Sequence, residues 1–221
     1  MTRARNARVA GVTFLLYIAV GITQMVLAGG TRAEGTAAKI ALMAQQAAQV
    51  RVNILLSFVI WITAITLAVA LYGLTRDEDH ELAMLALCFR VGEGMMAAVG
   101  TLATLGLLWL STAGNAAGTE ALGGFLLKAR GWNVTLAATL FAVGSTIFSW
   151  LLLRGRMIPV PLAWLGVVSS LLLVIALPLR LVGVVTDTVA QVLWLPMAAF
   201  EIPLAFWLLL KGVAPRPAPP V

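Results

Sequence analysis

The chain has 221 residues, of which 61% are hydrophobic and only 11% are charged. Soluble globular domains carry about 25% charged residues, so this composition excludes an ordinary soluble protein and indicates an integral membrane protein. The formal net charge is +6, but the basic residues are dispersed at the ends of apolar runs, which argues against a nucleic-acid partner and is typical of residues that set membrane topology.

Six apolar runs predict an all-α fold, an integral membrane bundle of six transmembrane helices. The runs cover residues 9–29, 53–74, 83–111, 133–153, 160–185 and 188–210. Each is long enough for the roughly 20 residues that cross a hydrocarbon core, and the first exceeds the apolar part of a signal peptide. Residues 1–213 are therefore interpreted as a single domain, followed by a disordered proline-rich tail at residues 214–221.

The connections between the runs predict the topology. Residues 37–46 and 122–128 are expected to form short interfacial helices in the two longer outside loops. Lysine and arginine favour the loops on the side of the termini, which predicts a multi-pass protein of the bacterial cell membrane with both termini cytoplasmic. Membrane lipid is the expected surrounding partner, and the sequence leaves the oligomeric state open.

The third run carries two ionisable residues, Arg90 and Glu93. A charged side chain near the bilayer centre costs at least about 2.5–3.5 kcal/mol, so such residues persist where they pair, line a wet cavity or take part in function. They lie one helical turn apart, which allows an ion pair on one helix face. Gly92 and Gly94 flank Glu93 and would let a neighbouring helix or a ligand approach its carboxylate.

The sixth run carries Glu201 between Pro196 and Pro203, and each proline is expected to kink the helix. Interrupted helices near the midplane are places where transporters build binding sites. Counting along the spans places Glu93 and Glu201 both about 15 Å deep. The same count places several other polar residues at that level, namely Tyr17, Ser145, Ser149, Ser169 and Ser170.

Polar groups at a shared depth are expected to face one another, because lipid cannot satisfy them. The sequence therefore predicts a midplane pocket, and its candidate ligand-binding residues are Arg90, Glu93, Glu201, Tyr17, Ser145, Ser149, Ser169 and Arg180. Arg180 lies nearer the outer end of its span, where it either reaches the interface or pairs with Asp187. Trp61 lies too deep for an interfacial aromatic belt and is expected in the core.

Cysteine and histidine are too scarce for most metal or haem sites. The chain has one cysteine, Cys88, and one histidine, His80, which excludes an intramolecular disulfide, a cysteine-based metal site and a bis-histidine haem. No cofactor and no metal is predicted.

The motif Arg90-Val91-Gly92-Glu93, the ending of the sixth run and the six-span layout resemble the bacterial membrane family DUF4386, a domain of unknown function. The resemblance covers nearly the whole chain. It implies a six-helix membrane bundle and marks Arg90, Glu93, Glu201 and Lys211 as matching positions. It implies no activity.

Three functions fit these observations. The first is a protein that binds or carries a small, lipophilic or ionic ligand in the midplane pocket. The second is an intramembrane enzyme for a lipid or isoprenoid substrate, with Glu93 and Glu201 as the candidate catalytic acid and base. The third is a structural or accessory subunit in which the charged residues only hold helices together. Sequence leaves open whether the chain is an enzyme.

Overall fold

Hydrophobic helices account for nearly all of the fold. The computed structural model describes residues 2–29, 33–112 and 118–214, and in these ranges it contains helices and no strand. The helices are α1 (Arg3–Gly29), α2 (Thr36–Gln45), α3 (Ala47–Thr75), α4 (His80–Thr112), α5 (Thr119–Arg154), α6 (Val160–Leu181), α7 (Asp187–Val192) and α8 (Trp194–Leu210).

Six segments of the described chain are long and apolar enough to cross a membrane: α1, α3, α4, α5, α6, and α7 together with α8. This confirms the predicted six-span, all-α architecture, and the protein is a multi-pass membrane protein. Large apolar side chains such as Leu102, Ile175 and Leu210 lie exposed on the outside of the bundle. In a membrane these side chains contact acyl chains rather than water.

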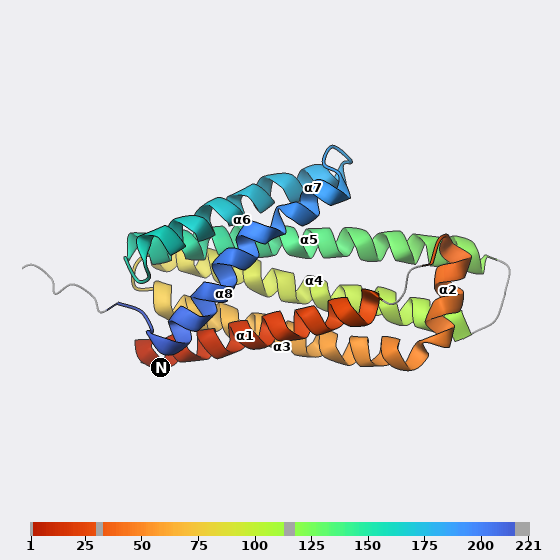
Figure 1. The fold of residues 1–221 in the computed structure, drawn as a ribbon, viewed down its shortest axis with the longest axis horizontal. Helices are drawn as coiled ribbons and strands as arrows, with labels where there is room; N and C mark the ends of the chain where they lie inside the picture. Colours follow the sequence, from red (N-terminus) through yellow and green to blue (C-terminus); the bar gives the residue numbers. More distant parts are fainter. Residues whose placement is uncertain (1, 30–32, 113–117, 215–221) are drawn as a thin grey trace, which may run out of the picture.

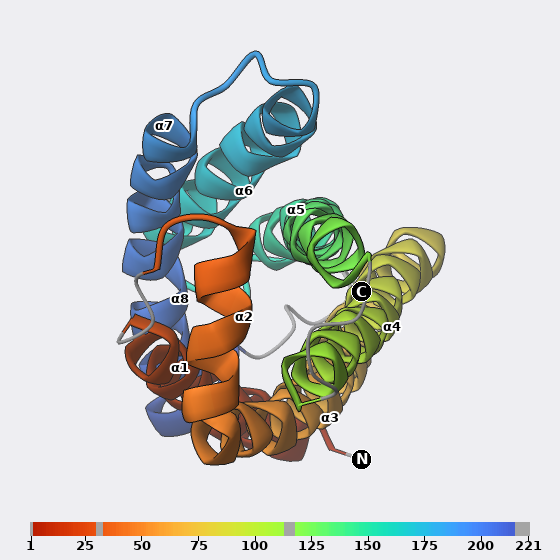
Figure 2. The same ribbon diagram turned by 90° about the vertical axis from the view of Figure 1, so that its right-hand side faces the viewer.

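The six long helices form a ring rather than a stack of layers. Each helix packs on the next in the order α1, α3, α4, α5, α6, α8, and α8 closes the ring on α1 (Figure 2). The closing contact is tight at Gly11, where an added Cβ would lie 2.6 Å from the backbone nitrogen of Leu209. From this crossing, α1 and α8 diverge along the bundle (Figure 1).

Helix α2 lies across one end of the ring, which we call the α2 end, and contacts α4, α5 and α3. The N-terminus and the last described residues lie at the opposite end, where the Ala214 amide donates to the Met157 carbonyl. Both ends of the chain share one side because the number of spans is even. Which compartment that side faces stays a prediction.

Two predicted segments differ in detail from the structure. Residues 122–128 are helical, as expected, but they form the first turns of α5 rather than a separate interfacial helix. The sixth span is interrupted at Leu193, between α7 and α8. Pro196 lies just after this break, and its missing N–H leaves the Val192 carbonyl without the helical hydrogen bond that it would otherwise accept. The expected interruption near Pro196 is therefore present, as a break at Leu193. The predicted tail lies almost wholly outside the described residues.

Candidate functional site

A buried carboxylate is held between two helices at the centre of the bundle. Glu93 of α4 is 6% exposed, and its Oε2 lies 2.8 Å from Nη1 of Arg90, one turn earlier. The hydroxyl of Tyr17 in α1 donates to Glu93 Oε1 at 3.0 Å. Each oxygen of the carboxylate therefore has one polar neighbour, and the arrangement ties α1 to α4.

Arg90 is almost fully enclosed, at 1% exposure, because α5 provides space for its long side chain. Gly144 faces the stem of this arginine, so an added Cβ there would lie 2.8 Å from Arg90 Cγ. The guanidinium carbon lies 4.5 Å from the centre of the Phe141 ring. A cation over an aromatic face gains attraction when water is excluded, so Phe141 stabilises Arg90 alongside Glu93.

Glu201 of α8 joins this group from the opposite side. It is 9% exposed and interacts electrostatically with both Arg90 and Glu93. Its Oε1 is buried without a hydrogen-bond partner among the described residues. In the described structure Arg90 forms its ion pair with Glu93, and Glu201 lies near enough to interact with both charges. The three ionisable residues that the sequence placed at one depth therefore lie close together.

A cavity of about 690 Å³ extends from this cluster to the α2 end of the bundle. Glu93 and Tyr17 belong to its wall, whereas Arg90 and Glu201 lie behind the wall. Lys39 of α2 and Gln46, which directly follows α2, line the other end. The volume falls within the range of about 300–1,000 Å³ that is usual for small-molecule sites.

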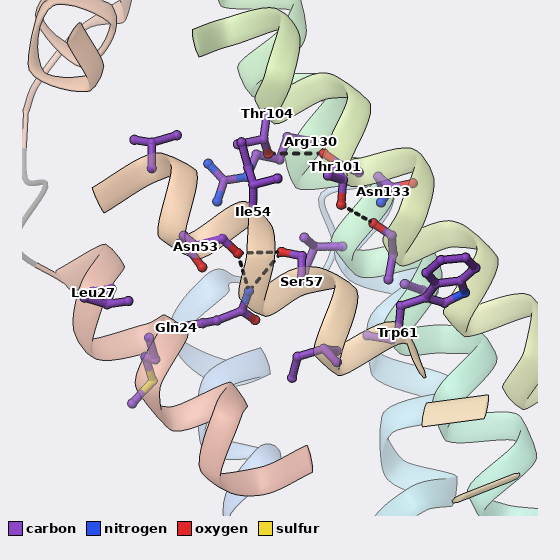
Figure 3. Close-up of a pocket in the computed structure, with 18 of the residues that line it drawn as sticks. Gln24, Leu27, Asn53, Ile54, Ser57, Trp61, Thr101, Thr104, Arg130 and Asn133 are labelled. Carbon is purple, nitrogen blue, oxygen red and sulfur yellow. Dashed lines mark hydrogen bonds between the residues drawn. The ribbon is translucent and has the colours of Figure 1, made fainter. Parts of the chain in front are cut away.

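Polar side chains line the cavity between its two ends (Figure 3). They come from α1, α3, α4 and α5, and include Gln24, Asn53, Ser57, Thr101, Thr104, Arg130 and Asn133. The Gln24 amide donates to Ser57 Oγ at 2.9 Å and to the Asn53 carbonyl at 3.1 Å, which joins α1 to α3. The wall therefore carries polar groups between its two ends, although apolar side chains make up most of it.

Sequence reasoning missed these lining residues, although a periodic signal marks some of them. From Glu93 of α4, the positions Ala97, Gly100, Thr101 and Thr104 follow after 4, 7, 8 and 11 residues, and all line the cavity. Such a stripe of small and polar residues lies on one helix face. Arg130 precedes the fourth apolar run at residues 133–153, so its position in the sequence is that of a residue at a helix end.

Several polar atoms of the wall lack hydrogen-bond partners among the described residues. They are Trp61 Nε1, Gln46 Oε1 and Asn133 Oδ1. Trp61, predicted as a core residue, packs on Gly94 and lines the cavity. Buried polar groups normally have partners, so a wall carrying both a free donor and free acceptors is suited to a polar ligand.

The remaining predicted site residues lie away from the cavity wall. Ser149 lies beside Gly166, and the Ser169 hydroxyl donates to the Gly166 carbonyl at 3.3 Å. Ser145 is partly buried in α5 and does not line the cavity. Arg180 Nε lies 2.8 Å from Asp187 Oδ1, which is one of its two expected arrangements. The geometry gives these four residues no contact with a ligand in this cavity.

In the described ranges, no three histidine, cysteine, aspartate or glutamate side chains gather closely enough to hold a metal ion. The chemistry available to the described cavity is therefore that of one held carboxylate, one tyrosine hydroxyl, amides, hydroxyls and two cationic side chains. These groups can bind and orient a ligand or exchange a proton with it.

A protein-family model described as "Domain of unknown function (DUF4386)" matches residues 9–212, which is nearly the whole chain. The match confirms the resemblance drawn from the third and sixth spans. No curated protein and no solved structure matches the chain.

Proposed function

Since the chain belongs to the DUF4386 family, whose function is unknown, we propose a function from the geometry of the cavity: the protein binds, and in its simplest role carries, a small or lipophilic ligand within the membrane. The observation that supports this proposal most directly is the cavity of about 690 Å³ with Glu93 in its wall. A cavity that only separated packed helices would need no held carboxylate and no unpartnered donors and acceptors.

In this proposal the charged residues have different roles. Glu93 contacts the ligand, because it is the acid that lines the cavity. Arg90 and Glu201 lie behind it and act as positioning residues, since they set the charge and orientation of the Glu93 carboxylate. Tyr17 both holds Glu93 and lines the cavity.

A filled cavity tests the proposal directly. Ala97 lines the cavity one turn from Glu93, whereas Val99 on the same helix is 53% exposed on the outside. Native mass spectrometry of the purified wild-type protein should show a bound mass that Ala97→Phe lacks and that the matched control Val99→Phe retains. If both variants fold and retain the bound mass equally, the result would contradict a ligand in this cavity.

The structural alternative has an observation in its favour, because Arg90 is enclosed by Glu93, Phe141 and the face of Gly144. A purely structural cluster predicts that Glu93→Gln, which preserves shape, leaves ligand retention unchanged. The ligand-binding proposal predicts reduced retention in a protein that still folds. The same variant thus separates the two functions.

The enzymatic alternative is supported by the two buried carboxyl groups, which could act as acid and base. It is less favoured because Glu201 lies behind the cavity wall and would not reach a substrate in this arrangement. If the protein is an enzyme, the mass retained by wild type should include a chemically altered form of the molecule retained by Glu93→Gln.

A further inference from the structure

The two ends of the cavity differ in charge. At the inner end, Glu93 already has Arg90 and Tyr17 as neighbours. At the α2 end, the cavity is lined by the cations Arg130, which is partly buried, and Lys39, which is exposed, and no ion pair in the described ranges includes either. A partly buried guanidinium that has no acidic partner among the described residues attracts an anion.

The neighbours of Arg130 indicate a second chemical group that the bound anion should carry. Asn133, one turn further along α5, is 8% exposed, and its Nδ2 donates to the Met96 carbonyl at 2.8 Å. Its Oδ1 is buried in the described structure without a donor. A ligand that fits both groups therefore carries negative charge for Arg130 and an O–H for Asn133 Oδ1, which a singly protonated phosphate monoester provides.

The cavity wall also includes apolar side chains that are exposed. Met25 of α1, Val134 of α5 and Trp194 of α8 all line the cavity, and they are 70%, 56% and 36% exposed. Met25 near the end of α1 and Trp194 at the start of α8 lie far along these helices from their crossing at Gly11 and Leu209. We call these three residues the window. Because it lies in membrane-spanning helices and is apolar, the window opens towards acyl chains rather than water.

We infer that the α2 end of the cavity binds the phosphate headgroup of an amphiphile, with Arg130 and Lys39 on the phosphate and the apolar chain lying in the window towards the bilayer. This inference rests on the proposed function and specifies its ligand class. A free phosphate ion would satisfy the same cations, but it would make no use of an apolar opening, so the amphiphile accounts for more of the geometry.

The experiment uses the full chain purified in dodecyl maltoside, a neutral amphiphile with a twelve-carbon chain. Inorganic phosphate, octyl phosphate and dodecyl phosphate are added in turn, and binding is measured by native mass spectrometry and by the shift in the thermal unfolding midpoint. Affinity should rise along this series, by about fourfold for each methylene that becomes fully buried. Equal binding of inorganic and dodecyl phosphate would overturn the window and the amphiphile.

A variant at the headgroup position tests the cation. Arg130→Gln should weaken dodecyl phosphate binding by about tenfold or more, because a charge-assisted hydrogen bond is lost. The matched control is Arg51→Gln, since Arg51 is exposed near the same end and does not line the cavity. Dodecyltrimethylammonium, a cation of equal chain length, should not bind measurably more tightly than dodecyl maltoside.

The outcomes separate this inference from the proposal on which it rests. Unchanged affinity in Arg130→Gln, together with lost binding in Ala97→Phe, would overturn the phosphate site and leave the ligand cavity standing. Unchanged affinity in both variants would overturn the two together. Should Arg130→Gln fail to fold, Arg130→Lys provides a second test, because a point charge in place of the planar guanidinium should weaken binding without abolishing it.

Discussion

Replacing Arg90 by methionine tests whether the buried cluster is a coupled unit. Methionine preserves the unbranched stem that packs against Gly144 and removes the guanidinium. Two interactions disappear with it, the 2.8 Å ion pair with Glu93 and the contact at 4.5 Å with the Phe141 ring. The Glu93 carboxylate is then left buried without its charge partner.

The expected loss of folding free energy in Arg90→Met follows from the burial of its ion pair with Glu93. Removing one partner of a buried ion pair costs about 3–5 kcal/mol of folding free energy, mostly because the other charge stays uncompensated. Removing both charges avoids that penalty. The double variant Arg90→Met/Glu93→Gln should therefore recover about 1–3 kcal/mol of the lost stability, and remain about 2 kcal/mol below wild type through the loss of the cation–π contact. A coupling free energy of about 2 kcal/mol or more is expected between the two positions.

Reversible unfolding in mixed micelles, followed by tryptophan fluorescence, measures the stability of four proteins: wild type, Arg90→Met, Glu93→Gln and the double variant. Together they form a double-mutant cycle. Arg154→Met serves as the control, because Arg154 pairs with Glu78 and Asp79 while half exposed. Such a pair contributes about 0–1 kcal/mol. Additive effects in the cycle, or an Arg90→Met loss no larger than that of Arg154→Met, would refute a coupled buried cluster.

Two glycine substitutions test the packing around the site. Gly144→Ala should destabilise the protein by about 1–3 kcal/mol in the same unfolding assay, because the new methyl group meets the stem of the buried Arg90 at 2.8 Å. Gly131→Ala in the same helix is the control: its methyl group would have no neighbour within 4 Å, so the stability should stay close to that of wild type. Gly123→Ala should displace α2, because the methyl group would overlap Ile40, and amide hydrogen exchange in α2 should become faster. Gly124→Ala, whose nearest neighbour lies at 3.5 Å, should leave that exchange unchanged, and equal exchange in both variants would show that α2 is not held at this contact.

The sequence alone determined the architecture and the residues of the buried cluster. Long apolar runs can satisfy their backbone hydrogen bonds within a membrane only as helices, so six runs predict six spans. Arg90, Glu93 and Glu201 were conspicuous for a related reason, since charge in an apolar span is costly. Counting residues gave their shared depth, because the rise per residue of a helix is fixed.

Tertiary structure alone decided which polar side chains face a common space. Depth fixes the level of a residue but not the direction of its side chain around the helix. From the sequence alone, Tyr17 and Ser149 were therefore equally good candidates for the pocket. Helix rotation placed Tyr17 on the Glu93 carboxylate and Ser149 beside Gly166. The cavity wall combines residues of α1, α3, α4 and α5, so it depends on contacts between residues far apart in the chain.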